Sequence, residues 1–233
     1  MEEIEGIRLK LKSVANEGFA KQSKKYLKSP YEFYGIRVPE LRKIAKEYKN
    51  LGIYNAYNLF EELWNSGNHE EMSLGLFILE NYKKQFNHET WKFLRQRLSK
   101  AKTWDHVDEI SSHIFGEILL KDLSLMTEIK EMSLSRNPWE RRTSMVSTIQ
   151  LIRKGKIELT FRLAEKLVYD EDVYVHKSAG WMLRECGKKQ RIATKEFMLM
   201  HLDMKSTAFS YATEKMKEMR EIKKRKKEEG KEK

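Results

Sequence analysis

The sequence predicts an all-α protein, an α-solenoid built from helix–turn–helix repeats. The 233 residues include only three prolines and 11 glycines, and 35% of them are charged, a composition typical of helical chains. No segment shows the alternation of apolar and polar residues with hairpin turns that marks β-strands. Helix starts also recur at a nearly constant interval, which indicates a repeat architecture.

The first half of the chain carries clear helix starts and stops. Residues 1–28 are expected to form one helical stretch, which ends before Pro30 because proline breaks a helix interior. Pro39 is expected in the first turn of the next helix, where a missing N–H costs nothing. Asn68 and Asn87 are good N-caps for two further helices, since their side chains can accept from free backbone N–H groups.

The second half continues in the same way. Thr103 is the expected N-cap of a helix that begins at Trp104. Residues 137–140 combine an asparagine N-cap, a proline at the first helical position and a glutamate at the third, which is a strong start signal. Residues 170–173 begin another helix, and Ser206 begins the last one.

One set of these starts has a steady period. The gaps between them are 32, 33, 35, 34 and 33 residues, and the starts lie near Pro39, Glu71, Trp104, Trp139, Val173 and Ser206. A shorter helix is expected within each interval, near residues 54, 87, 122, 157 and 190. Helix pairs of this kind form HEAT, armadillo or TPR solenoids. No TPR signature is present, so we interpret residues 1–216 as a single domain of HEAT-like repeats, with an irregular all-α bundle as the alternative.

Charge and cysteine content narrow the class of protein. The net charge is +11, which suggests a polyanionic partner, with nucleic acid as the first candidate. Residues 217–233 are rich in lysine and arginine and are expected to form a helical extension or a disordered tail. The single cysteine, Cys186, excludes an internal disulfide and fits a reducing compartment. No secretory signal or membrane span is visible, so we expect a soluble, cytoplasmic monomer.

The segment around Trp104 and Asp108 is the candidate functional site. On a helix these residues lie one turn apart on the same face, which sets an indole beside a carboxylate. The alternative is a core tryptophan and a solvated aspartate. In a solenoid, equivalent helices line one concave face, and Arg42, Arg142 and Trp181 are expected on it with Arg184. A carboxylate among such cations repels phosphate, so DNA binding alone gives no reason for Asp108 to be there.

Five segments together resemble DNA alkylation-repair glycosylases of the AlkD type. They are YLK at 26–28, YGIRVPELR at 34–42, TWDHVD at 103–108, WERR at 139–142 and AGWMLRE at 179–185. The resemblance runs from about residue 5 to 216. It implies a superhelix of HEAT-like repeats that holds duplex DNA in a concave basic groove. It also implies hydrolytic release of N3- and N7-alkylated purines without a metal or other cofactor and without base flipping.

The resemblance also implies roles for individual residues. Asp108 matches the catalytic carboxylate, and Trp104 and Trp181 match the two indoles that flank the damaged nucleotide. The residues that match DNA contacts are Tyr26, Arg37, Arg42, Arg142 and Arg184. Arg37 stands where relatives carry a smaller polar residue, and the tail after Met216 matches no family pattern. Through its DNA substrate, the protein is expected to associate with the nucleoid.

The chemistry of the substrate explains these residue types. A purine alkylated at N7 or N3 is already cationic, so no acid is needed to protonate the leaving group. The barrier is the positive charge that develops on the sugar, and a fixed carboxylate can stabilise it and orient a water molecule. Two alternatives stay open: a non-catalytic solenoid that binds bent or branched DNA, and a protein-binding scaffold. The six histidines are scattered in sequence, which argues against a metal site.

Overall fold

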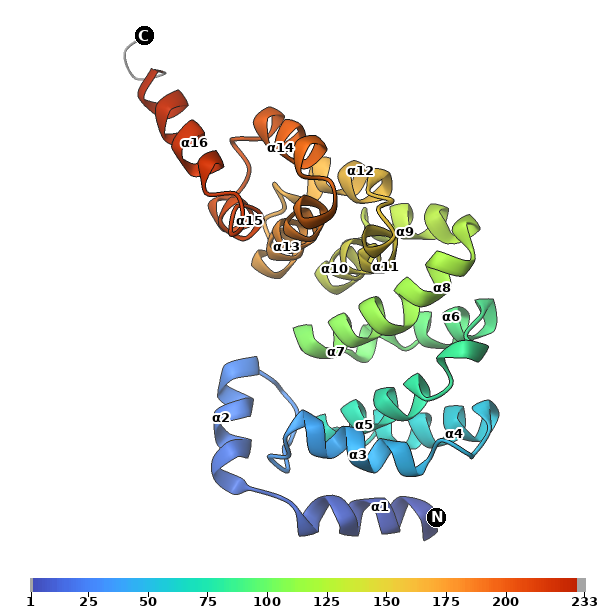
Figure 1. The fold of residues 1–233 in the computed structure, drawn as a ribbon. Helices are drawn as coiled ribbons and strands as arrows, with labels where there is room; N and C mark the ends of the chain where they lie inside the picture. The colour runs from blue at the N-terminus through green and yellow to red at the C-terminus, as the bar shows by residue number, and fades with distance from the viewer. Residues whose placement is uncertain (1, 230–233) are drawn as a thin grey trace. The chain divides into compact units, whose positions relative to one another are not determined.

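The computed structural model describes residues 2–229, and in this part of the chain helices joined by short loops make up the regular structure (Figure 1). Outside the helices there is an isolated bridge between Glu32 and Asn68, and within the described residues no β-strand forms. This confirms the predicted all-α class. Each helix of the same region is too short or too polar to span a lipid bilayer.

The chain divides into two compact units, a first unit that ends at Ile114 and a second that starts at Phe115. The α-helices that begin in the first unit are α1 (Glu2–Ser13), α2 (Glu17–Leu27), α3 (Val38–Glu47), α4 (Ile53–Trp64), α5 (His69–Glu80), α6 (His88–Arg95) and α7 (Trp104–Glu109). Short 3-10 turns η1 (Lys83–Gln85) and η2 (Leu98–Lys100) flank α6, and a π-helix, η3 (Ile110–Phe115), follows α7. The expectation of one repeat domain over 1–216 stays a prediction.

The second unit continues the series. Its helices are α8 (Gly116–Lys121), α9 (Met126–Met132), α10 (Pro138–Val146), α11 (Ile149–Arg153), α12 (Glu158–Leu167), α13 (Val173–Lys189), α14 (Arg191–Met200), α15 (Ser206–Ala212) and α16 (Glu218–Glu229), with a 3-10 turn η4 (Leu123–Leu125) before α9. The described part of the basic tail is thus helical, and residues 230–233 lie outside the described residues.

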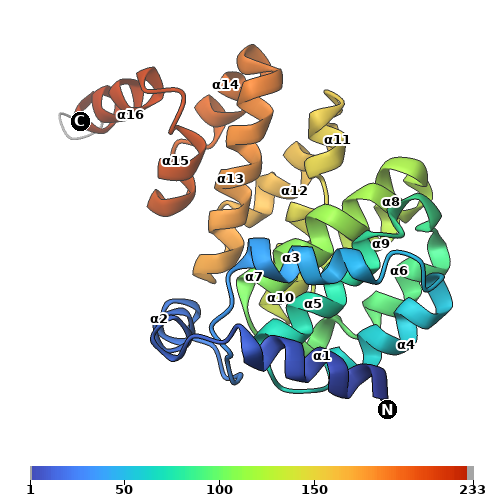
Figure 2. The same ribbon diagram turned by 60° about the horizontal axis from the view of Figure 1, so that its bottom comes forward.

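The helix starts confirm the period read from the sequence. Helices α3, α5, α7, α10, α13 and α15 begin within two residues of the predicted positions. In the first unit α5 packs against α3 and α7, and in the second unit α13 packs against α10 and α15, as Figure 2 shows for α13 and α15. Equivalent helices of neighbouring repeats therefore lie side by side within each unit.

The prediction of one helical stretch over residues 1–28 was wrong. The structure has two helices, because Asn16 adopts an extended conformation (φ −136°, ψ 107°) and caps α2. Its side-chain oxygen accepts from Phe19 N at 2.8 Å, and its own N–H donates to the Tyr34 carbonyl at 2.9 Å. The asparagine thus ends one helix, starts the next, and joins α2 to the segment before α3.

The apolar core runs along the helix pairs. Its largest fully buried side chains include Phe60, Trp64 and Trp91 in the first unit and Phe115 in the second. Two of the chain's five tryptophans are therefore structural, which makes the partly exposed Trp104, Trp139 and Trp181 the remaining candidates for function.

Candidate nucleic-acid interface and carboxylate site

Helix α7 carries Trp104 and Asp108 one turn apart, as predicted. Both side chains are half-buried. Val107 and Ile110 are fully buried and anchor the helix in the core. At about 100° per residue, Asp108 falls between Trp104 and Asp105 around the helix axis, one turn further along. The carboxylate thus shares the face of the helix that bears the indole.

Thr103 stands at the N-cap position, but it does not cap with its side chain. Its backbone is extended (φ −129°, ψ 146°) and no side-chain cap bond forms. The hydroxyl instead lies 3.3 Å from His106 Nδ1. The expected position was therefore right and the expected hydrogen bond was wrong, because a buried imidazole nearby takes the hydroxyl.

Tyr26 lies beside Trp104 although 78 residues separate them in sequence. The two rings meet edge to face, with centroids 6.0 Å apart and planes at 83°, and Tyr26 is 73% exposed. Helix α2, which carries Tyr26, packs directly against the backbone of Gly35. Gly35 has a φ of +79°, and a Cβ there would overlap the Asn16 carbonyl oxygen. A glycine thus allows α2 to approach, and the approach brings Tyr26 to Trp104.

Sequence reasoning missed a buried ionic group directly beneath this face. Asp105 accepts from His69 Nε2 at 2.9 Å, and the His69 and His106 rings stack with centroids 4.3 Å apart. Burial works to raise the pKa of Asp105, but the His69 hydrogen bond and the neighbouring imidazoles hold it well below its usual range. Burial lowers the pKa of His106 to about 3, so this ring is neutral. The sequence did hold a signal for this buried group. Ser73 and His106, whose side chains bond at 2.9 Å, lie one repeat period apart.

Arg42, predicted to bind DNA, is half-buried between two carboxylates. Its guanidinium donates to Glu80 at 2.9 Å and to Glu109 at 2.6 Å, and it lies over the Phe77 ring, 4.0 Å from the centroid. Burial and the Glu109 carboxylate raise the pKa of Glu80 to about 9. Burial also acts to raise the pKa of Glu109, but its hydrogen bond with Glu80 and the nearby His113 and Arg42 hold that pKa below its ordinary value. Arg37 is exposed, with its guanidinium 4.9 Å from the Phe19 ring centroid.

Two side-chain clusters in the first unit have donor atoms close enough for a metal ion. One is His69, Asp105 and His106, and the other is Glu80, Glu109 and His113. In the first cluster the three side chains already bond to one another or to Ser73 and Thr103, and in the second Arg42 supplies the positive charge. Both donor sets are occupied by the protein's own groups, so neither is built around an ion.

The predicted site residues of the second unit lie on α10 and α13. Arg142 is only 6% exposed, and its guanidinium donates to the Tyr174 carbonyl. Arg184 pairs with Glu214 and lies 3.4 Å from Glu185. Trp181 is half-buried on α13. These residues belong to the second unit, whereas Trp104 and Asp108 belong to the first. That they share one groove stays a prediction.

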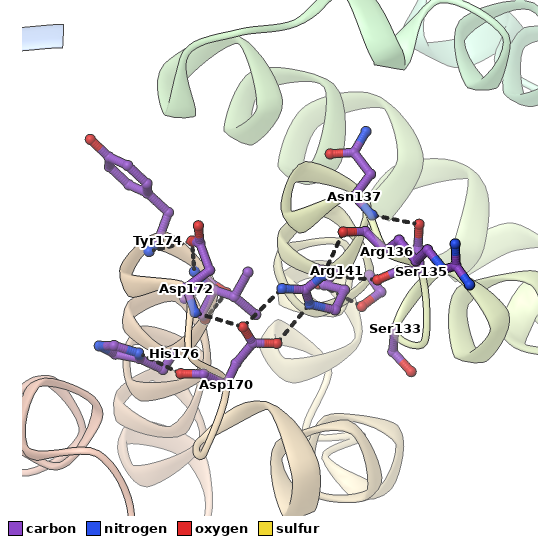
Figure 3. Close-up of polar contacts among 12 residues, drawn as sticks. Ser133, Ser135, Arg136, Asn137, Arg141, Asp170, Asp172, Tyr174 and His176 are labelled. Carbon is purple, nitrogen blue, oxygen red and sulfur yellow. Dashed lines mark hydrogen bonds and ion pairs between the residues drawn. The ribbon is translucent and has the colours of Figure 1, made fainter. Parts of the chain in front are cut away.

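A network of polar contacts joins the starts of α10 and α13 (Figure 3). Arg141 forms a two-pronged ion pair with Asp170, at 2.6 and 2.9 Å, and also donates to the carbonyls of Ser135 and Arg136. The backbone N–H of Asp172 donates to the Asp170 carboxylate. Both partners of the ion pair are largely buried, so this network fixes the two loops that precede Arg142 and Trp181.

Comparisons with known proteins agree with this architecture. The family model described as DNA alkylation repair enzyme matches residues 7–216. A predicted DNA alkylation repair enzyme from Enterococcus faecalis has a similar structure, with a TM-score of 0.75, 21% identity, and coverage of 87% of this chain and 96% of that one. AlkD2 from Streptococcus mutans gives a TM-score of 0.59 at 20% identity, covering 76% and 89%. No protein with a curated function gave a significant match.

Proposed function

Because the chain belongs to the DNA alkylation repair enzyme family, we propose that it is a DNA glycosylase for positively charged N3- and N7-alkylated purines in duplex DNA. One observation carries the proposal: Asp108 is half-buried on the indole-bearing face of α7, one turn after Trp104. A phosphate-binding surface gains nothing from such a carboxylate, whereas a reaction that develops positive charge does.

The reaction is hydrolysis of the bond between C1′ of the sugar and the alkylated nitrogen. The electron pair of that bond neutralises the cationic purine as it leaves. Positive charge builds on the sugar, where the Asp108 carboxylate stabilises it and orients a water molecule. The water oxygen bonds to C1′ and its proton is released. This uses one of the two carboxylates of ordinary glycosidases, since the leaving group needs no acid.

The indoles and cations have separate roles in this proposal. Trp104 and Trp181 flank the lesion nucleotide and favour positive charge through their ring faces. The residues proposed to bind DNA are Tyr26, Arg37, Arg42, Arg142 and Arg184. Tyr26 and Arg37 are exposed, so they can contact DNA without rearranging. A guanidinium has five N–H donors, so an arginine already bonded to a protein oxygen can also donate to a phosphate.

The setting follows from the substrate. The protein acts as a monomer on chromosomal DNA in the cytoplasm, associated with the nucleoid, and the proposed chemistry requires no metal or cofactor. The protein acts on the nucleotide from the backbone side, without flipping the base, as the family resemblance implies.

A base-release assay tests the proposal. Purified protein is incubated with methylated duplex DNA, and free 7-methylguanine and 3-methyladenine are measured by chromatography. Asp108→Asn is expected to slow single-turnover release by about 10²-fold or more, by analogy with other lost electrostatic stabilisers, without weakening DNA binding. Glu62→Gln, which alters an exposed carboxylate on α4, is the matched control and retains the wild-type rate. No release by the wild-type protein would refute the enzyme assignment.

A second candidate function, DNA binding without catalysis, is supported by a separate observation. The net charge of +11 and the basic helix α16 favour binding to DNA whether or not catalysis occurs. A non-catalytic protein that binds bent or branched DNA would shift such DNA in a salt-dependent manner and release no base. A protein-binding scaffold would show no affinity for DNA at physiological salt.

A further inference from the structure

The second unit contains a pocket of about 270 Å³ between α9, α11 and α12. Its floor is apolar, because Leu151 and Leu159 are only 2% and 7% exposed and Met126 is half-buried. Leu123 also lines the pocket and leaves 40% of its surface in solvent. The volume lies just below the roughly 300–1,000 Å³ of sites for drug-sized ligands. The pocket therefore has room for one large apolar side chain rather than for an extended ligand.

Cations surround this apolar floor. Lys130, Lys156 and Arg162 line the pocket, against a single lining carboxylate, that of Glu158. Lys156 and Arg162 are exposed, and Lys130 is half-buried. Among the residues that the structure describes, none of these three cations forms an ion pair. Their charges are thus available to an anion from another molecule, and such pairs form strong hydrogen bonds.

A ligand that fits this pocket must be both apolar and anionic. DNA phosphates would satisfy the cations, but they would leave the leucine side chains against a hydrated backbone. A neutral apolar ligand would fill the floor and leave the cations without partners. An acyl chain would need a longer channel than the pocket offers. A peptide with one bulky apolar side chain among acidic residues satisfies both parts of the lining, since the side chain anchors it and the carboxylates meet the cations.

The pocket lies away from the starts of α10 and α13, where the polar network of Arg141 and Asp170 is located. The turn that carries Lys156 is held at the other end of α13, because the Gly155 carbonyl accepts from Gln190 Nε2 at 2.5 Å. Helix α13 has 17 residues, so its two ends are about 25 Å apart at 1.5 Å per residue. A partner in the pocket would thus leave the starts of both helices uncovered.

We propose that this pocket is a docking site for an acidic peptide segment of a partner protein, with one bulky apolar side chain bound between α9 and α12. The proposal is independent of the glycosylase function, because no lining residue has a role in that reaction. The cations attract the acidic segment and speed its association, whereas the apolar anchor slows its dissociation. Binding therefore weakens as the salt concentration rises.

Fluorescence anisotropy of labelled peptides tests the docking site on the full chain. The probe is a short peptide with one phenylalanine between two pairs of aspartates and with both ends blocked. One comparison peptide has alanine in place of the phenylalanine, and another has lysines in place of the aspartates. The probe is expected to bind about tenfold more tightly than either. No binding of the probe would overturn the proposal. Equal binding of the alanine peptide would do so too, because it would indicate a general surface for polyanions such as DNA.

Charge-reversal variants locate the binding. Arg162→Glu reverses an exposed cation of the lining and is expected to weaken probe binding by about tenfold. Lys217→Glu is the matched control, because Lys217 is exposed in the same unit and does not line the pocket. The control should change the affinity by less than about twofold. Equal weakening by both variants would contradict the assignment, since it would reflect only the net charge.

A second pair of variants tests the apolar anchor. Leu123→Ala shortens an apolar lining residue and is expected to weaken probe binding by about three- to fivefold. Leu134→Ala is its control, because Leu134 is 65% exposed and lies outside the lining. Circular dichroism checks that each variant is folded, and base release from methylated DNA should be the same in both. Undiminished probe binding by Leu123→Ala together with Arg162→Glu would place the peptide elsewhere and overturn the proposal.

Discussion

Helices α7 and α13 each present a half-buried tryptophan, but with opposite charges beside it. Trp104 on α7 is followed one turn later by the carboxylate of Asp108, whereas Trp181 on α13 lies one turn after Lys177 and one turn before Arg184. A carboxylate suits a developing positive charge, and cations suit phosphate. Under the proposed function, the repeat with α7 would provide the chemistry and the repeat with α13 would bind the DNA backbone.

The two helices also differ in how they are held. Helix α13 is 17 residues long and starts from the Arg141–Asp170 network, whose ion pair is largely buried. Helix α7 continues without a break through η3 into α8. It lines a cavity with Trp104, Asp105 and Glu109 and rests on the buried, neutral imidazole of His106. The following tests, from the largest expected effect to the smallest, can break or sharpen this contrast.

Removing the ion pair at the start of α13 should cost most. Arg141→Met leaves the largely buried Asp170 carboxylate without its main partner, which is expected to lower the free energy of unfolding by about 3 kcal/mol. Chemical denaturation measures this loss in the free energy of unfolding. Arg136→Met, on the exposed neighbouring residue, is the control and should change stability by less than about 0.5 kcal/mol. Similar values for both variants would show that the network does not hold α13.

Close packing of α13 should be the next most sensitive feature. Gly180 faces α15, and a Cβ there would overlap the Ala208 carbonyl oxygen. Gly180→Ala is therefore expected to destabilise the protein by about 2 kcal/mol, despite the better helix propensity of alanine. A Cβ at Gly187 on the same helix meets the flexible end of Met216 and makes an ordinary contact with the Thr194 methyl group, so Gly187→Ala should cost far less. If Gly180→Ala leaves the free energy of unfolding unchanged, α13 is not closely packed against α15.

Acid should loosen α7 through His106. The pKa of this ring is about 3 in the folded protein against an ordinary 6.5, so the unfolded chain binds the extra proton between these values. The contribution of His106 to stability is complete well above pH 6.5 and is lost as the pH drops toward 3, by about 1–2 kcal/mol between pH 7 and pH 5. Glu80, whose pKa is raised to about 9, contributes in the opposite direction over this range, so the loss is read as the difference between the wild type and His106→Gln. Hydrogen exchange of α5 and α7 amides is measured for both proteins, and an identical pH dependence would show that His106 does not contribute.

The smallest effect is expected at Lys177. If α13 grips phosphate, Lys177→Gln should weaken DNA binding by about three- to tenfold and reduce the salt dependence by about one counterion. The single-turnover rate at saturating protein should not change, in contrast to Asp108→Asn. Titration of labelled duplex DNA at several salt concentrations gives both quantities. A slower saturated rate would mean that the two helices do not divide the work as proposed.

The sequence predicted the helix pairs well because their signals are local. Asn68, Asn87 and Asn137 cap helices where their side chains were expected to, since an N-cap depends only on the next few residues. The same reasoning failed at Asn16, because residues 1–28 lack a proline or a charge break there. The deciding contact for Asn16 is with Tyr34, which local patterns do not contain.

Partners of the candidate site were less predictable than its positions. Trp104 and Asp108 could be placed on one helix face by spacing alone, whereas the burial of Arg142 and the pairing of Arg42 with Glu80 and Glu109 depend on neighbouring repeats. The His69–Asp105 pair was missed for the same reason. Contacts between neighbouring repeats follow the repeat period, so comparing residues 32–38 positions apart is the sequence signal that could have found most of them.

Helix α2 stands over the cavity beside α7 only because residue 35 has no side chain. Any other amino acid there would push α2 away from the segment before α3 and widen the mouth of the cavity by the same movement. A single codon change at residue 35 would thus shift Tyr26 relative to Trp104 without altering either ring.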